Sequence, residues 1–116
     1  MNNKPKYHLI RNTSYAIDGL KHAFKTESSF RLELIAGVFI IPAIIFIDAS
    51  IEAKLILLVT AFLVAIVELL NSAVENAVDL VTVEKHPLAK TAKDIGATAV
   101  FFSIALHFIC WVLVLL

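Results

Sequence analysis

The sequence predicts an all-α membrane protein with one amphipathic helix on the membrane surface and three helices across the bilayer. Composition is the first reason: the 116-residue chain is 59% hydrophobic and 17% charged. Soluble domains carry about a quarter charged residues. A chain this short has too little interior to hide so much apolar surface from water. The second reason is three long apolar stretches, each near the length that a helix needs to cross a bilayer.

Residues 6–26 are expected to form the surface helix. Its apolar residues recur at helical spacing along one stripe: Ile10, Ile17, Leu20 and Phe24. Its basic residues lie toward the other side: Lys6, Arg11, His22 and Lys25. A helix of this kind lies in the membrane interface, on anionic lipid. Tyr15 points away from the apolar stripe and could therefore reach an aqueous ligand.

The three spanning helices are expected at residues 29–48, 52–83 and 89–116, within a single domain that covers residues 1–116. Glu27, Ser28 and Ser29 precede the first and could cap it, and Pro42 could kink it. The second would be roughly 45 Å long, which exceeds the hydrocarbon thickness of about 30 Å, so its last turns should stand outside the membrane. Residues 82–90 read as a polar loop. His107, in the third span, is expected to make an interhelical hydrogen bond.

Basic residues predict the orientation. They precede the first span and join the second to the third, whereas only Lys54 lies near the other short turn. The positive-inside rule then puts the N-terminus and the 82–94 loop in the cytoplasm and the C-terminus outside. The polar start predicts no cleaved signal peptide.

A polar stripe follows the uncharged run 55–67. On a helix, Glu68, Asn71, Glu75 and Asp79 fall at about 0°, 300°, 340° and 20°, so they share one narrow face. Such a face is usually solvated in a soluble protein, but ionisable groups at membrane depth mark functional sites. Further polar residues are expected at the same cytoplasmic surface: Glu27, Arg31, Glu33, Lys93 and Asp94.

The chemistry of this cluster favours phosphoryl transfer. Carboxylates and an amide suit Mg²⁺, which binds through one or two carboxylates and substrate phosphates, and a lysine suits phosphate as a point charge. Phosphoryl transfer needs metal, positive charge and a base for the accepting hydroxyl. Gly19, Gly37 and Gly96 lie too far apart for a glycine-rich phosphate loop. The lone Cys110 excludes an intramolecular disulfide, and no basic cluster indicates nucleic acid.

Two other classes of protein fit the same residues. The carboxylate stripe could be a proton or cation pathway, or the polar face could serve only helix association in a non-catalytic subunit. An enzyme is favoured because the charges gather at one surface and no polar track continues through the spans. Three spanning helices and one surface helix are too few to enclose a site, which favours an oligomer with sites between subunits.

Three segments carry a family resemblance. Residues 68–79 read Glu-Leu-Leu-Asn-Ser-Ala-Val-Glu-Asn-Ala-Val-Asp, residues 84–96 read Glu-Lys-His-Pro-Leu-Ala-Lys-Thr-Ala-Lys-Asp-Ile-Gly, and residues 27–33 read Glu-Ser-Ser-Phe-Arg-Leu-Glu. With these motifs the chain resembles, over nearly its whole length, the prokaryotic diacylglycerol kinases. These are small trimeric lipid kinases of the bacterial cytoplasmic (inner) membrane.

The resemblance implies roles for individual residues. Glu68 matches the catalytic base that takes the proton of the lipid hydroxyl, and Glu27 and Glu75 match the pair that holds Mg²⁺ with ATP. The other residues on the ATP side are Tyr15, Glu84, His86, Lys93 and Asp94. The residues on the lipid side are Ser29, Phe30, Arg31, Glu33, Glu68, Asn71 and Trp111. The family also implies a homotrimer with shared sites, on the cytoplasmic side.

Some of these assignments have structural alternatives. Arg31 and Glu33 could pair with each other, Trp111 could be an interfacial anchor, and Asp79 could be a structural carboxylate. The sequence departs from the family's pattern at His8, where an arginine is frequent, and at Ala97, where a serine is common.

The acceptor is expected to be diacylglycerol, which would give phosphatidic acid. Undecaprenol is the alternative acceptor, and a small ion- or proton-translocating protein is the distant alternative.

Overall fold

The computed structural model describes residues 8–116, in which every regular element is an α-helix. The four helices are α1 (Leu9–Thr26), α2 (Ser28–Phe46), α3 (Ile51–Val81) and α4 (Pro87–Leu115). The predicted fold class, an N-terminal helix followed by three long apolar helices, is confirmed. The first two residues of the expected surface helix, Lys6 and residue 7, lie outside the described residues, as does Lys4.

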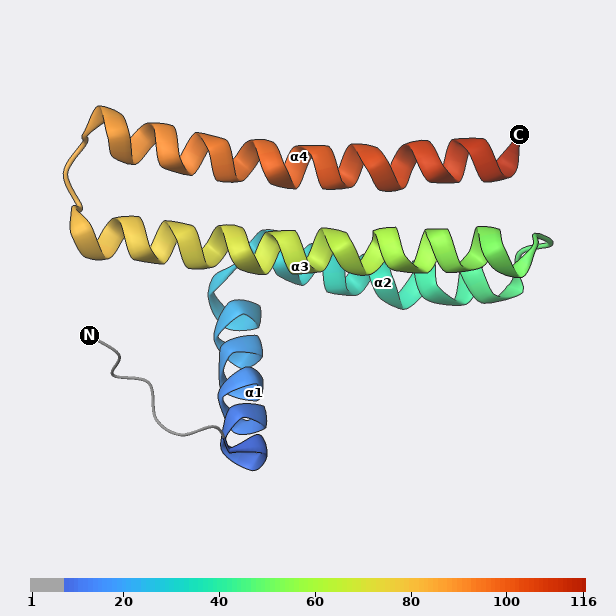
Figure 1. Ribbon diagram of the computed structural model, residues 1–116, viewed down its shortest axis with the longest axis horizontal. Helices are drawn as coiled ribbons and strands as arrows, with labels where there is room; N and C mark the ends of the chain where they lie inside the picture. Colours follow the sequence, from blue (N-terminus) through green and yellow to red (C-terminus); the bar gives the residue numbers. More distant parts are fainter. Residues whose placement is uncertain (1–7) are drawn as a thin grey trace.

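Helix α3 is the centre of the molecule. It packs against both α2 and α4, whereas α1 packs on α2 and projects sideways from one end of the bundle (Figure 1). The buried residues of α3 recur every three or four positions along one face: Leu57, Thr60, Val64, Glu68 and Ser72. This spacing is that of a helix with a single buried stripe. The stripe changes from apolar to polar toward the end at which α1 leaves the bundle.

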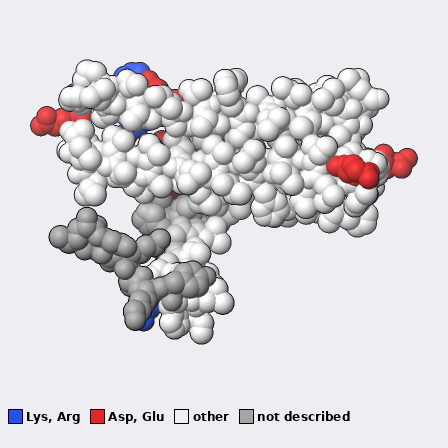
Figure 2. Space-filling model, in the orientation of Figure 1, with Lys and Arg blue, Asp and Glu red and all other residues white. Residues whose placement is uncertain are grey.

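The three bundle helices are long and apolar enough to cross a membrane. At most 17% of the residues in their most apolar windows are buried within the chain, so their apolar side chains face outward. On the face shown in Figure 2, charged side chains gather at the two ends and the surface between them is uncharged. An apolar outer surface of this extent is expected where the solvent is lipid rather than water. With 31 residues, α3 is roughly 46 Å long and extends beyond the hydrocarbon layer.

The corner between α1 and α2 is held by Arg31. Glu27 is the single extended residue between the two helices, and the Nη1 of Arg31 donates to the carbonyl oxygens of Phe24 and Lys25, at 2.9 Å each. These carbonyls belong to the last turn of α1, which has no intrahelical donors left and favours a cation. Arg31 thus engages α1 and not Glu33. Of the three residues that could cap α2, Glu27 occupies the N-cap position, but its side chain makes no capping hydrogen bond, and Ser28 and Ser29 lie within the helix.

The connection between α2 and α3 covers residues 47–50 and is slightly longer than predicted, whereas the connection between α3 and α4 covers residues 82–86 and is shorter. Ser50 caps α3 by accepting from the amide of Ala53. His86 caps α4 by accepting from the amide of Leu88, and Pro87 is the first residue of that helix. A proline fits this position because its φ is helical and the missing N–H would have no partner. The expected loop 82–90 therefore ends at His86.

Candidate active site

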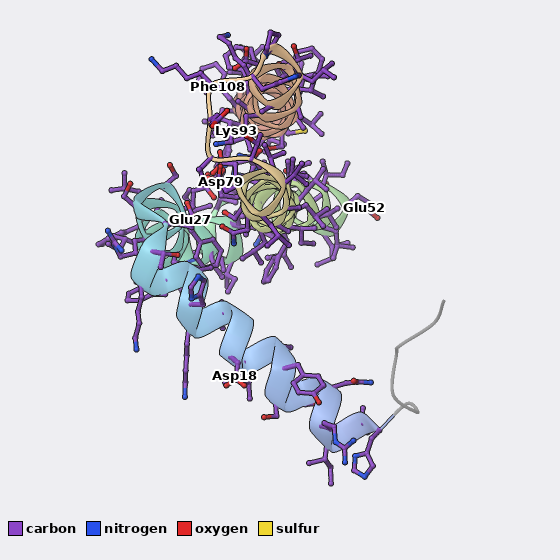
Figure 3. The ribbon with its side chains drawn as sticks, turned by 90° about the vertical axis from the view of Figure 1, so that its left-hand side faces the viewer. Asp18, Glu27, Glu52, Asp79, Lys93 and Phe108 are labelled. Carbon is purple, nitrogen blue, oxygen red and sulfur yellow. The ribbon has the colours of Figure 1, made fainter. Side chains whose placement is uncertain are left out.

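A polar cluster lies where α1 meets α2, beside the C-terminal part of α3 and the first turns of α4 (Figures 1 and 3). Its residues come from the α1–α2 corner and from three helices: Glu27, Glu33, Glu68, Asn71, Glu75, Asp79 and Lys93. The expected gathering of the stripe on α3 with residues from α2 and α4 therefore occurs within one chain.

Glu68 lies at the centre of the cluster and is 6% exposed. Its side chain and that of Glu33 on α2 line the same cavity, and the carboxylates of Glu27 and Glu75 are close enough to act on it electrostatically. Among residues 8–116, Oε2 of Glu33, Oε2 of Glu68 and Oδ1 of Asn71 are buried without a hydrogen-bond partner. A buried acceptor without a partner costs about 1–3 kcal/mol. Three such acceptors in one place indicate a binding site in which a ligand supplies the hydrogen-bond donors.

Asn71 is held between its own helix and α4. Its Nδ2 donates to Oε1 of Glu75 at 3.4 Å, and its Oδ1 lies against the backbone of Gly96, where a Cβ atom would collide with it. The absent side chain at position 96 therefore lets α4 approach α3 beside the cluster. Sequence reasoning did not single out Gly96 for this role. Its position about one turn after Lys93 was the available signal.

Two ion pairs lie at the entrance of the cluster. Nζ of Lys93 is 2.7 Å from Oδ1 of Asp79, which joins α4 to α3 (Figure 3). Nζ of Lys90 is 2.6 Å from Oδ2 of Asp94, one turn along α4. The side chain of Lys93 is 40% exposed, so its ammonium group remains accessible to a phosphate. The sequence analysis did not include Lys90 among the site residues, although it lies four residues before Asp94, the spacing of a helical ion pair.

The donors in the cluster fit a divalent ion that arrives with a phosphate ligand. In residues 8–116 no group of three or more His, Cys, Asp or Glu side chains could hold a metal ion alone. Glu27 and Glu75 both lie near Glu68, and a pair of carboxylates is the usual protein contribution to Mg²⁺ bound with substrate phosphates. The residues present therefore fit such an ion.

Two cavities meet at Glu33. The smaller, about 240 Å³, has polar residues of α2 and α3 on one side and apolar residues of α4 on the other: Ser29, Glu33, Glu68 and Asn71, and Ala97, Val100 and Ile104. The larger, about 580 Å³, runs between α2, α3 and α4 and has apolar walls apart from Glu33 and His107. Glu33 and Ile104 line both. A polar chamber thus adjoins an apolar one at the level of Glu68.

The other predicted site residues lie outside these chambers. Phe30 is 1% exposed and packs in the core. Glu84 and His86 are exposed in the connection before α4. Tyr15 lies on α1, twelve residues before Glu27, roughly 18 Å along the helix. Trp111 lies near the opposite end of α4, where its Nε1 donates to Nε2 of His107 at 3.0 Å. The expected interhelical bond of His107 is present, at 2.7 Å from Oγ1 of Thr60.

Fold and site together define a helical membrane protein with a carboxylate-rich chamber at one end of its bundle. The family model of the prokaryotic diacylglycerol kinases matches residues 14–115. The diacylglycerol kinase of Pseudomonas aeruginosa is 37% identical over 108 residues, 93% of this chain and 88% of that protein. That of Haemophilus influenzae is 39% identical over 104 residues, 90% and 88% of the two chains. That of Escherichia coli is 35% identical over 107 residues, 92% and 88%. The chain belongs to the prokaryotic diacylglycerol kinase family.

Proposed function

We propose that the protein is an ATP-dependent diacylglycerol kinase that transfers the γ-phosphate of MgATP to the primary hydroxyl of 1,2-diacylglycerol, giving phosphatidic acid. The relatives named above are called diacylglycerol kinases, which supports the acceptor and the reaction type. The observation that carries the proposal is the position of Glu68, a buried carboxylate with an unpartnered oxygen where an apolar cavity meets a polar one. An amphiphile with a hydroxyl group at its polar end matches that boundary.

Glu68 acts as the general base. Its unpartnered oxygen accepts the proton of the lipid hydroxyl, and the hydroxyl oxygen forms a bond to the γ-phosphorus while the bond from that phosphorus to the β–γ bridging oxygen breaks. ADP carries away the electron pair of the broken bond. Asn71 donates to Glu75 and so orients it beside the base. General-base catalysis of this kind contributes about 10²–10⁴-fold in rate.

Glu27 and Glu75 would hold Mg²⁺ together with the nucleotide, and the ion would supply positive charge to offset that of the phosphates. Lys93 adds a positive charge on the same side, because its ammonium group is accessible beside Asp79. Asp94, Glu84 and His86 face the nucleotide from the start of α4 and the connection before it. Ser29 and Glu33 contact the head of the lipid in the polar chamber, whereas Phe30 and Arg31 support the site through packing and the α1–α2 corner.

We further propose a homotrimer in the bacterial cytoplasmic (inner) membrane, with the polar cluster and the N-terminus in the cytoplasm and residues 1–116 forming one domain. The distribution of basic residues supports this orientation. The distance of Tyr15 from the cluster along α1 supports shared sites, since a neighbouring subunit could bring its Tyr15 to the nucleotide.

The experiment is phosphorylation by MgATP in detergent–lipid micelles, with dioleoylglycerol and undecaprenol offered in parallel. Faster transfer to diacylglycerol is the expected result. Faster transfer to undecaprenol would change the acceptor and leave the roles of the residues intact. Transfer to neither lipid by the folded protein with magnesium present would contradict a lipid kinase and favour ion or proton translocation.

A further inference from the structure

Thr60, His107 and Trp111 form a continuous hydrogen-bonded chain between α3 and α4. Trp111 Nε1 lies 3.0 Å from His107 Nε2, and His107 Nδ1 lies 2.7 Å from Thr60 Oγ1. The hydroxyl of Thr60 also reaches the carbonyl oxygens of Ile56 and Leu57, at 2.9 and 3.1 Å. Thr60 is 7% exposed, and His107 and Trp111 are half-buried.

The direction of each hydrogen bond follows from the groups involved. An indole nitrogen can only donate, so Nε2 of His107 accepts and Nδ1 carries the proton. Nδ1 then donates to the Thr60 oxygen, and the Thr60 hydroxyl donates to a carbonyl of its own helix. Both nitrogens of the imidazole are therefore engaged. Because a displaced ring would leave polar groups without partners in an apolar surrounding, the ring is fixed in one orientation.

This ring lines the large apolar cavity at a defined depth. Helices α3 and α4 are antiparallel: Lys93 pairs with Asp79 at the polar end and His107 with Thr60 farther in. Thr60 precedes Glu68 by eight residues, so the His107 ring lies roughly 12 Å deeper than the candidate base. That depth is most of one leaflet, which is about half of the 30 Å hydrocarbon layer. The walls between the two levels are apolar.

We propose that His107 forms the floor of an acyl-chain cavity and sets the chain length that the enzyme prefers. The inference rests on the proposed function and names the part of the substrate that fills the cavity. One acyl chain of diacylglycerol is the occupant, because the cavity is apolar along its length and opens at Glu33 onto the chamber that holds Glu68. An acyl chain that extends past the imidazole ring must displace His107, which is hydrogen-bonded to both Thr60 and Trp111.

The test compares kcat/KM for a series of symmetric diacylglycerols (dihexanoyl, dioctanoyl, didecanoyl and dimyristoyl) in micelles of one fixed composition. His107→Ala removes the ring and deepens the cavity, so the highest kcat/KM should shift to a longer member of the series than in the wild type. Phe108→Ala is the matched control. Phe108 is the next residue, 67% exposed, and does not line the cavity, so this change should leave the chain-length profile as in the wild type.

A second variant acts in the opposite direction and removes no polar group. Ala61 lines the cavity beside Thr60, and Ala61→Leu should shorten the preferred chain. An unchanged profile in this variant overturns the proposal, as would an unchanged profile in folded His107→Ala. Loss of oligomer in Ala61→Leu with an unchanged profile would mean that a second copy covers the cavity. In all these cases the wild type still phosphorylates diacylglycerol, whereas failure of the proposed function would leave the wild type inactive on every lipid of the series.

Discussion

Two polar clusters lie on the same face of α3, eight residues apart, and they differ in how their hydrogen bonds are satisfied. Around Thr60, His107 and Trp111 supply partners from α4, and the chain closes within the protein. Around Glu68, three buried acceptors have no partner among residues 8–116. Buried polar groups are normally paired. A satisfied cluster therefore holds its side chains in fixed positions, as it holds the His107 ring in the cavity wall, whereas an unsatisfied one indicates a place where a ligand supplies the missing partners.

The largest change in rate is expected for Glu68→Gln, which tests the unsatisfied cluster. The amide keeps the shape of the side chain and cannot accept the hydroxyl proton, so kcat should fall about 10²–10⁴-fold while ATP binding changes little. Initial rates and nucleotide binding, both measured in detergent–lipid micelles, separate the two effects. Glu52→Gln, on the first turn of α3 at the opposite end of the bundle, is the control and should retain wild-type rate. A loss of ATP affinity as large as the loss of rate would contradict the role of base.

The metal pair predicts a smaller effect that magnesium can reverse. In Glu75→Gln the concentration of Mg²⁺ for half-maximal rate should rise about tenfold or more, because one of the two carboxylates is lost. A magnesium titration of the rate at saturating ATP measures the change, and excess magnesium should restore part of the activity. Asp18→Asn, on α1 away from the cluster (Figure 3), serves as control. A rate that magnesium does not rescue would argue against metal binding by Glu75.

The membrane helices could be predicted from the sequence because the signal is long and depends on composition. Three apolar stretches of spanning length and a short turn at residues 48–50 leave few alternatives. The helix ends were less predictable: Pro87 reads as a loop residue, yet it begins α4 because its cap residue, His86, places it at the first helical position. Such ends depend on single capping contacts rather than on periodicity.

The candidate site could be predicted only where its residues share one helix. The face of Glu68, Asn71 and Glu75 follows from helical geometry alone. The cavity that Glu68 and Glu33 share and the close approach of Gly96 to Asn71 depend on how α2, α3 and α4 pack. Thr60 was overlooked because one hydroxyl in a run of apolar residues can bond to its own helix. Its importance lies in a partner 47 residues away.

The satisfied cluster predicts a change in stability rather than in chemistry. Trp111→Phe removes the donor to His107 and leaves Nε2 unpartnered, which should cost about 0.6–2 kcal/mol of stability, with kcat/KM for diacylglycerol within about twofold of wild type. Thermal unfolding in detergent and the kinase rate measure the two quantities. In a His107→Phe background the same change should cost much less, since no acceptor remains. A large loss of lipid kcat/KM at unchanged stability would make Trp111 a substrate contact instead.

The smallest expected effect is that of Gly96→Ala, which tests how the packing of α4 supports the unsatisfied cluster. The added Cβ collides with Oδ1 of Asn71, but that atom is at the tip of a side chain that can turn away. The turn would break the bond to Glu75, so we expect a loss of rate of a few-fold, about 1 kcal/mol or less. Gly19→Ala, with open space around position 19, should leave the rate unchanged. In an Asn71→Ala background, Gly96→Ala should cost nothing further, because the colliding side chain is gone. An equal cost in both backgrounds would place the role of Gly96 in helix packing alone and remove Asn71 from the explanation.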